Sequence, residues 1–328
     1  MCRTGSIPRG MRRFRLVLLT LLAAALAPAT ASAACPDGPG TVWVDYAAYA
    51  VYDTPVESIL ARPGTLLAVQ NPKWRDSYQA KGADTVGWYM RLLSIVGTVK
   101  DPKPRSQVLA KVLQLTTLAR EMTSCTRPWL TLNEMQAVQV HEPATYAQRR
   151  FRANVLALAK ALDNRGVRVL LLMPRIPFEK TRYRSYWREL STHADLVYEA
   201  YTWSSLTVNR LGDIAARNYL RNKWTETMQR LKRFVVSMRH AGIVIPYWSR
   251  PRRAPSGREN LSDARWFRLT RIKTLAVGDV ARATDLGTIW SWGWQTNPKV
   301  GEVDPDKPMA ACYYLQARDP SLCDPATL

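Results

Sequence analysis

Several motifs of common enzyme classes are missing from this sequence of 328 residues. It has no G-x-G-x-x-G turn and no Walker A loop, which excludes the usual nucleotide-binding turns. It has no G-x-S-x-G motif, and three scattered histidines do not support a Ser/His/Asp order. No Cys-x-x-Cys or Cys/His spacing predicts a metal site. We therefore expect neither a metal nor a cofactor.

The sequence also lacks an apolar segment long enough to cross a bilayer. The apolar run Leu16–Leu26 covers about 11 residues, whereas a transmembrane helix needs roughly 20. Arg12, Arg13 and Arg15 precede this run, and a small-residue Ala-Ser-Ala site ends at residue 33. These are the three parts of a secretory signal peptide. Residues 1–33 are therefore predicted to be removed, giving a secreted or extracytoplasmic product that does not insert into the membrane.

Acidic residues are scarce: 26 Asp and Glu accompany 47 Lys and Arg, for a net charge of +21. Residues 1–33 hold five arginines and no acid, so the processed chain carries +16. A basic surface of this kind can bind nucleic acid or an anionic cell-wall polymer, or it can serve solubility alone. Because an exported protein seldom meets nucleic acid, we expect no nucleic-acid partner and favour the other two interpretations.

Four cysteines remain after processing, namely Cys35, Cys125, Cys312 and Cys323. In an oxidising compartment an even count indicates disulfides. Cys312 with Cys323 closes a short loop, which leaves Cys35 to pair with Cys125. Two alternatives are four free thiols and a lipid on Cys35, although Ser32 stands where a lipobox carries an aliphatic residue.

One pattern recurs along the chain: an amphipathic helix, a glycine, then a short apolar strand. Tyr146–Asn164 has its apolar residues on one helical face, and Gly166 separates it from the apolar run Val167–Met173. Two later segments repeat this order, with Gly242 and Gly287 as the stops. Such alternation predicts parallel strands joined by crossover helices.

Extending this pattern gives eight strands in roughly 270 residues, the size of a single-domain α/β protein of the (β/α)8 TIM barrel class. An open doubly wound sheet usually has fewer strands and a glycine-rich turn. The barrel is predicted over residues 34–297, followed by a C-terminal tail over 298–328 that is locked by a disulfide. The predicted strands are Thr41–Tyr46, Leu66–Gln70, Thr85–Met90, Trp129–Asn133, Val167–Met173, Asp195–Tyr201, Ile243–Trp248 and Thr288–Trp292.

The chemistry of such barrels lies at the carboxyl ends of the strands. The residues expected there combine acids, an amide and many aromatic rings. That mixture is typical of a sugar site, where carboxylates act on the glycosidic bond and flat rings stack on sugar faces. The candidate catalytic residues are Glu134 and Glu199, and the candidate substrate-binding residues are Asp45, Asn133, Tyr201, Trp248, Trp292 and Trp294.

The segment from Trp129 to Glu134, a strand ending in Asn-Glu at the fourth position of the repeat, resembles the strand-four motif of clan A glycoside hydrolases. The resemblance implies that Glu134 is the acid/base and that Asn133 hydrogen-bonds the sugar 2-hydroxyl. The clan also has a Trp near the end of strand eight, which Trp292 or Trp294 matches. The implied partner is a glycan.

Strand seven departs from the clan. The clan has a nucleophilic Glu there, but Ile243–Ser249 contains no acid. The nearest substitute is Glu199 on strand six, two strands from Glu134, from where both side chains can lean toward the barrel axis. Either the chemistry is rebuilt on Glu134 and Glu199, or the barrel has lost it and binds a glycan or cell-wall polymer without catalysis.

Each candidate also has a structural explanation. Glu134 can cap the following turn, Glu199 can pair with an arginine in a buried salt bridge, and Asp45 can orient a loop. The tryptophans near residue 292 can be packing residues. Besides the hydrolase and the glycan-binding barrel, a third hypothesis is an exported structural or interaction protein. His141 follows strand four and is a further residue of interest.

Overall fold

The computed structural model describes residues 40–46, 55–140, 143–177, 184–201, 204–248, 260–294 and 305–328, together with Cys35 and Arg258. The predicted signal peptide lies outside the described residues, so it stays a prediction. Among the helices that the structure describes, none combines the length and the apolar character needed to span a membrane.

Eight parallel strands close into one barrel, which confirms the predicted fold. Each strand pairs with the next along the chain, and β1 pairs with β8 to complete the circle, with Val42 opposite Thr288. The strands are β1 (Val42–Asp45), β2 (Leu66–Val69), β3 (Asp84–Tyr89), β4 (Trp129–Leu132), β5 (Arg168–Met173), β6 (Asp195–Glu199), β7 (Ala241–Pro246) and β8 (Thr288–Trp292).

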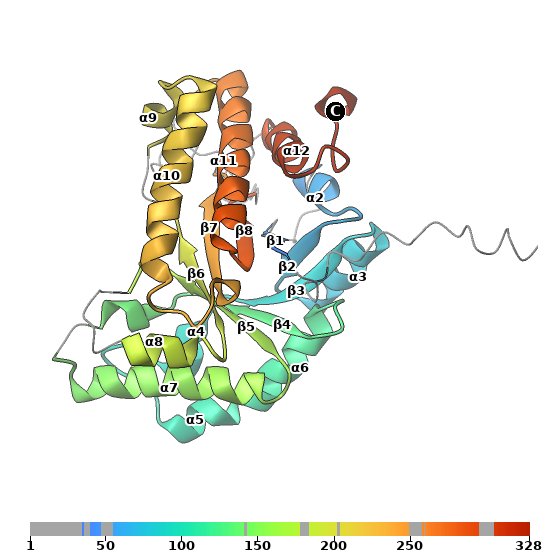
Figure 1. The fold of residues 1–328 in the computed structure, drawn as a ribbon. Helices are drawn as coiled ribbons and strands as arrows, with labels where there is room; N and C mark the ends of the chain where they lie inside the picture. The colour runs from blue at the N-terminus through green and yellow to red at the C-terminus, as the bar shows by residue number, and fades with distance from the viewer. Residues whose placement is uncertain are drawn as a thin grey trace, which may run out of the picture. The chain divides into compact units, whose positions relative to one another are not determined.

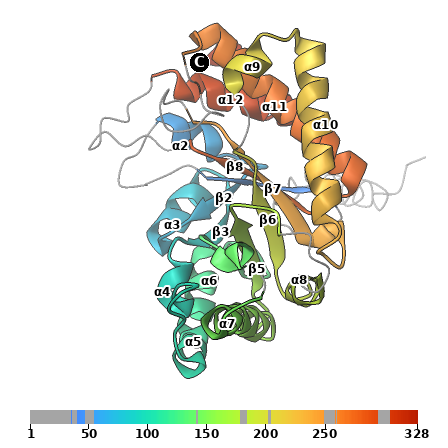
Figure 2. The ribbon, with the colours of Figure 1, turned by 90° about the vertical axis from the view of Figure 1, so that its left-hand side faces the viewer.

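Helices cover the outside of the barrel (Figure 1 and Figure 2). In both views α10 and α11 lie side by side, and α12 packs against α11 and α2. The helices are α2 (Pro55–Leu60), α3 (Pro72–Ala80), α4 (Leu92–Val96), α5 (Arg105–Ala110), α6 (Val112–Met122), α7 (Tyr146–Asp163), α8 (Arg184–Leu190), α9 (Ser205–Asn209), α10 (Asp213–Leu231), α11 (Asp263–Thr284) and α12 (Lys307–Arg318), with short 3-10 helices at Gln136–Gln139, Met238–His240 and Pro325–Thr327.

Helix α7 shows how the sequence sets these elements. It begins at a capping box, in which the Thr145 side chain accepts from the Gln148 backbone and the Gln148 side chain accepts from the Thr145 backbone. Its apolar face, including Phe151 and Leu158, is buried against the core. Gly166 follows with a left-handed φ of 78°, which ends the helix and admits β5.

Alternation along the strands divides the apolar residues into two clusters. One fills the barrel and includes Val44, Tyr46 and Val197, and the other lies between the barrel wall and the helices. Successive side chains of a strand point to opposite faces. Glu199, two residues after the interior Val197, therefore points into the barrel, whereas Asp45, between Val44 and Tyr46, points outward.

One detail differs from the sequence prediction. Gly242 is a residue of β7 and not a stop before it. Glycine suits this position because a Cβ there would lie 3.0 Å from both the Thr288 carbonyl oxygen and Val197. A side chain there would require these neighbours to shift by a few tenths of an ångström, so glycine favours the close packing of the adjacent strands. The predicted C-terminal tail contains α12, which follows β8 and packs against α11 and α2.

Both predicted disulfides are confirmed. Cys35 pairs with Cys125, and Cys312 pairs with Cys323. The first joins the segment before β1 to the segment before β4, and the second joins α12 to the chain that follows it. Disulfides persist in oxidising compartments, so the pairs fit an extracytoplasmic protein.

Candidate functional site

Glu199 is a half-buried acid at the carboxyl end of β6. It points into the barrel mouth between two other inward residues, Val197 below it and Tyr201 above it. Burial, and to a lesser extent the negative charge of Glu134, together raise the pKa of Glu199 to about 7. The two candidate carboxylates are therefore close enough to interact electrostatically, and one of them holds a proton near neutral pH.

Glu134 adopts an unusual backbone conformation immediately after β4. Its φ is 69°, in the left-handed region that costs a non-glycine residue energy. The Asn133 side-chain oxygen stabilises this turn by accepting from the Glu134 amide at 2.9 Å. The alternation of β4 places Thr131 and then Asn133 on the inward side, and the left-handed turn at Glu134 ends this alternation. The Glu134 side chain is exposed, in contrast with that of Glu199.

The two structural explanations for these glutamates find no support among the described residues. The 3-10 helix after Glu134 has Met135 at its N-cap and no side-chain cap, so Glu134 does not cap it. Within the same part of the chain, no arginine or lysine forms an ion pair with Glu199. An ion pair would lower a carboxyl pKa, whereas that of Glu199 is raised.

Aromatic rings from three strands meet on one side of the barrel mouth. Trp292 stacks on Tyr46 with centroids 4.8 Å apart, and it meets Trp88 edge-on at 5.1 Å. Trp292 is half-buried, whereas Tyr46 and Trp88 are almost fully buried beneath it. The Gln70 amide donates to the Tyr46 hydroxyl at 3.0 Å, which fixes the supporting ring. Trp292 is therefore held as a rigid, partly accessible platform.

A second aromatic pair stands beside Glu199. The rings of Tyr201 and Trp248 are 5.1 Å apart, and both residues are half-buried. A Cβ at Gly293 would lie 2.0 Å from Trp248, so glycine at this position, with a φ of 97°, is required for the indole to pack there. Burial and then the charge of Glu199 raise the pKa of Tyr201. The Tyr201 hydroxyl is buried and has no hydrogen-bond partner among the described residues.

Asp45 and Trp294 do not join this group. Both are fully buried and lie on the outer side of the barrel wall. The Asp45 carboxylate accepts hydrogen bonds from Ser291 at 2.8 Å and from Tyr314, and it pairs with Arg318 at 3.2 Å. Trp294 stacks on Tyr247 at 4.7 Å and donates to Ser291. A substrate cannot reach either side chain in this conformation, so the structure favours their packing roles over the predicted substrate contacts.

Three inward-pointing residues at the mouth, Tyr46, Gln70 and Trp88, were not among the candidate site residues, although Tyr46 and Gln70 end two of the predicted strands. Strict alternation would have found them, because Val44, Ala68 and Val86 lie two residues before them in the inward series of β1, β2 and β3. His141 lies outside the described residues, as do residues 47–54, 178–183, 249–257 and 295–304. Within the described part of β7 and its end, Ala241–Trp248, no acid is present.

No protein-family model matches the chain, and a search of curated proteins finds no relative. Solved structures do match in fold. A chitinase from Chromobacterium violaceum has a TM-score of 0.50 and 12% identity, covering 83% of this chain and 98% of its own. A glycoside hydrolase family 5 enzyme from Prevotella bryantii has a TM-score of 0.52 and 12% identity, covering 88% and 93%. A mutant of that enzyme, in complex with a xyloglucan tetradecasaccharide, has a TM-score of 0.51. At these identities the likeness concerns the fold alone, and the chain shares the TIM barrel fold of these enzymes.

Proposed function

We propose that this protein binds a poly- or oligosaccharide at the carboxyl ends of its strands and hydrolyses a glycosidic bond with Glu134 and Glu199. The observation that carries the proposal is the raised pKa of Glu199, to about 7, by burial and by the charge of Glu134. Glycosidases act through two carboxyl groups, one protonated and one ionised. Such a pair is recognised when the environments of two neighbouring acids give them different pKa values.

The environments of the two acids favour Glu199 as the proton donor. Its half-buried side chain keeps the proton up to about pH 7, whereas Glu134 is exposed to solvent. Glu134 is then the ionised partner, acting as a nucleophile or as the base that activates water. This division reverses the one that the strand-four resemblance implies, in which Glu134 is the acid/base. Glu199 on β6 also supplies the second carboxylate that β7 lacks.

The aromatic residues at the mouth supply the binding surface in this proposal. Trp248 and Trp292, at the ends of the adjacent strands β7 and β8, present partly accessible rings, and flat rings stack on the apolar faces of sugars. The Tyr201 hydroxyl, which has no partner among the described residues, and the Asn133 amide are polar groups within two residues of the glutamates in sequence. A buried hydroxyl without a partner costs free energy that a bound sugar hydroxyl would recover.

A non-catalytic glycan-binding barrel is the second candidate function. The missing acid on β7 favours it, because the resemblance to clan A hydrolases fails there. The aromatic platforms serve binding equally well with or without catalysis. The partner in this case is a glycan or an anionic cell-wall polymer, and export through the predicted signal peptide gives access to either.

A panel of oligosaccharides separates the two candidates. We expect the wild-type protein to cleave at least one of them, and Glu134→Gln to bind that oligosaccharide with little loss while no longer cleaving it. Binding without cleavage by the wild type, lost in Trp292→Ala, would replace the enzyme by the binder. If neither binding nor cleavage occurs, both candidate functions fail.

The raised pKa of Glu199 predicts a pH-dependent effect on stability. The pKa in the unfolded chain is near the ordinary 4.5, so the favourable contribution of this residue is complete below pH 4.5 and is lost as the pH rises through 7. Glu199→Gln removes this loss. We expect the free energy of unfolding of the variant to exceed that of the wild type by up to about 3 kcal/mol at pH 8 and to match it near pH 4.5.

Urea unfolding at both pH values measures this difference. The exposed Glu226 on α10, whose side chain is 67% accessible, provides the control Glu226→Gln, for which we expect the same stability as the wild type at both pH values. An unchanged gap between Glu199→Gln and the wild type across this pH range would show that the carboxyl group titrates normally.

A further inference from the structure

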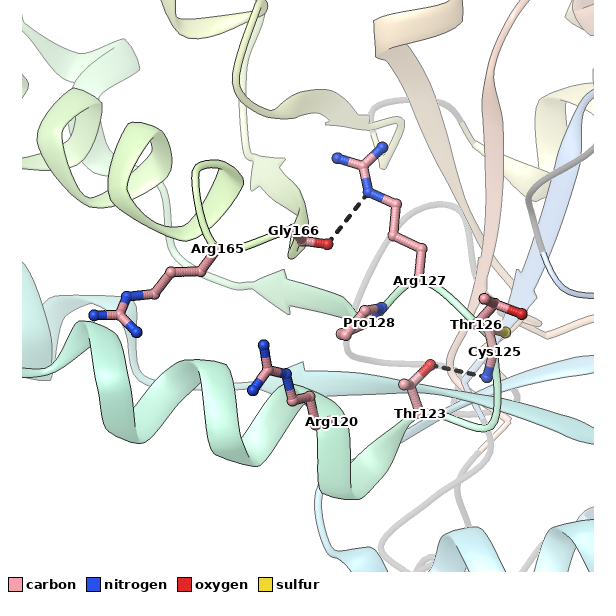
Figure 3. A pocket seen from close by; sticks show the side chains of 8 residues that line it. All are labelled: Arg120, Thr123, Cys125, Thr126, Arg127, Pro128, Arg165 and Gly166. Carbon is pink, nitrogen blue, oxygen red and sulfur yellow. Dashed lines mark hydrogen bonds between the residues drawn. The ribbon is translucent and has the colours of Figure 1, made fainter.

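A concave basic surface lies at the end of the barrel opposite the proposed glycan site. A pocket of about 760 Å³ opens beside the starts of β4 and β5, between the end of α6 and the turn after α7. Figure 3 shows its arginines: Arg120 comes from the last turn of α6, Arg127 precedes β4, and Arg165 follows α7. The amino ends of parallel strands lie at one edge of the barrel, so this pocket is separate from Glu134 and Glu199.

The pocket has three cationic side chains and no acid among the residues that line it. Arg120 and Arg165 are exposed, and neither has an acidic partner in the part of the chain that the structure describes. Arg127 is the exception, since it pairs with Asp163 at 3.3 Å. Elsewhere on the surface arginines commonly meet an acid: Arg217 and Arg282 both pair with Asp279, and Arg268 pairs with Asp213. Two of the three arginines of the pocket are therefore unneutralised within the described part of the chain, which leaves the site positive.

The backbone around these arginines is fixed. Cys125 is tied to Cys35 by a disulfide, and the Thr123 hydroxyl accepts from the Cys125 amide at 3.3 Å. Gly166 holds the left-handed turn, and its carbonyl oxygen accepts from Arg127 at 3.4 Å. A rigid frame lowers the entropy lost when a ligand orders the side chains.

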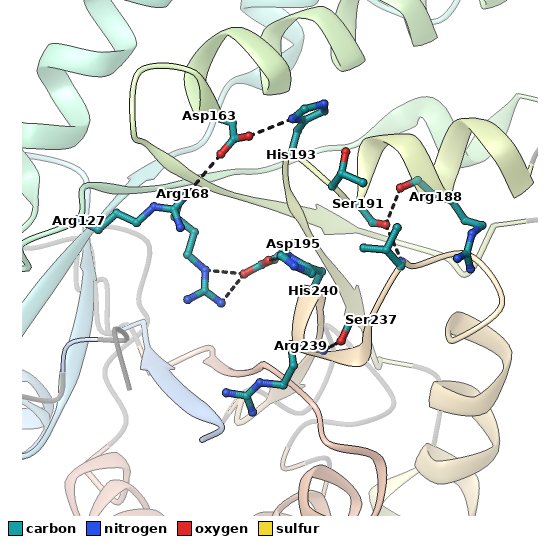
Figure 4. Close-up of polar contacts among 12 residues, drawn as sticks. Arg127, Asp163, Arg168, Arg188, Ser191, His193, Asp195, Ser237, Arg239 and His240 are labelled. Carbon is teal, nitrogen blue, oxygen red and sulfur yellow. Dashed lines mark hydrogen bonds and ion pairs between the residues drawn. The ribbon is translucent and has the colours of Figure 1, made fainter. Parts of the chain in front are cut away.

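The positive surface continues around the same end of the barrel. A second pocket of about 350 Å³ shares Arg127 with the first and contains Arg168, Arg239, His193 and His240. Figure 4 shows that its two acids are already engaged. Asp163 contacts Arg127 and His193, and Asp195 contacts Arg168 and His240. These acids leave Arg120 and Arg165 without neutralisation, and no acid from this second pocket is free to repel an anion.

We propose that the pocket of Arg120, Arg127 and Arg165 binds the carboxylate or phosphate groups of an anionic cell-wall polysaccharide. Guanidinium groups match both anions, because their planar pairs of N–H donors bind two oxygens at once. Several such contacts along one polymer add up to useful affinity although each exposed pair is weak. The pocket anchors the protein on its polymer, and the opposite end of the barrel stays open.

Two double variants distinguish binding at this pocket from a general effect of the positive surface charge. Arg120→Gln with Arg165→Gln removes two charges from the pocket, and Arg105→Gln with Arg221→Gln removes two exposed charges from α5 and α10. Titration calorimetry with polygalacturonate at low salt provides the affinity. We expect the pocket pair to weaken binding at least tenfold and the control pair less than threefold. Equal weakening by both pairs, or no binding by the wild type, would overturn the proposal.

Three further probes define the chemistry. Inorganic tripolyphosphate carries phosphate groups without a sugar, polygalacturonate carries carboxylates, and dextran is neutral. Competition by tripolyphosphate at the same site identifies phosphate as the preferred group, and its failure to compete identifies carboxylate. Binding of dextran with the same affinity contradicts an anion site. The pocket lies at the opposite end of the barrel from Glu134 and Glu199, so a failure of the proposed hydrolysis leaves this inference separately testable.

Discussion

Replacing Glu199 by glutamine is expected to lower the turnover of a hydrolysed glycan by roughly 10²–10⁴-fold, which corresponds to about 3–5 kcal/mol of barrier. The amide keeps the shape of the acid but cannot donate its proton to the leaving oxygen. In the wild type, kcat/KM is expected to fall as the pH rises through about 7, because Glu199 then loses this proton. The measurement is the rate of reducing-end formation between pH 4 and 9.

An aryl glycoside with a strongly acidic leaving group separates the roles of the two glutamates. Such a group departs without protonation, so Glu199→Gln is expected to recover most of its rate on this substrate. Glu134→Gln should remain slow, since the ionised carboxylate is still missing. The opposite pattern would return the acid role to Glu134, and full activity of both variants would remove them from catalysis. Glu226→Gln serves as the matched control.

Asp45→Asn is expected to be the most destabilising conservative substitution in the barrel wall. The carboxylate is fully buried and pairs with Arg318, whose side chain is only 11% exposed. The amide cannot neutralise that guanidinium, and leaving a charge buried without its partner costs about 3–5 kcal/mol. Asp45 also joins β1 to β8 through Ser291 and to α12 through Tyr314, so the loss affects the closure of the barrel.

Urea unfolding at pH 7 measures this loss, with Asp76→Asn as the control. Asp76 forms an ion pair with Arg75 at 2.8 Å but is 68% exposed, and such pairs contribute up to about 1 kcal/mol. A loss below 1 kcal/mol for Asp45→Asn would contradict the structural role. Reduced glycan binding at unchanged stability would restore the predicted substrate contact.

The fold was predictable because its signals are local and repeated. The apolar face of α7, the glycine at 166 and the apolar run of β5 lie within 28 residues of sequence, and the same order recurs to the end of β8. The disulfides followed from counting, since Cys312 and Cys323 are near neighbours and only one other pair remains. Exact strand bounds were less predictable, as Gly242 shows, because its role depends on Val197 and Thr288 in the adjacent strands.

The candidate site was predictable only in part. Position at a strand end is visible in the sequence, but the side of the wall to which a residue points depends on the phase of the alternation. Asp45 and Trp294 were selected by position and lie outside the barrel, whereas Tyr46 and Trp88 lie inside it. The interaction of Glu199 with Glu134 depends on the burial of one and the left-handed turn of the other, and neither property leaves a mark in the sequence.

The most direct test of the proposed carboxylate pair is a titration of the Glu199 side-chain carboxyl by carbon-13 NMR. The expected midpoint is about 7 in the wild type, and it is expected to shift downward in Glu134→Gln, because a neutral amide no longer repels the ionised form. The signal is assigned by its absence in Glu199→Gln. A midpoint near 4.5, or one that Glu134→Gln leaves unchanged, would contradict the pair.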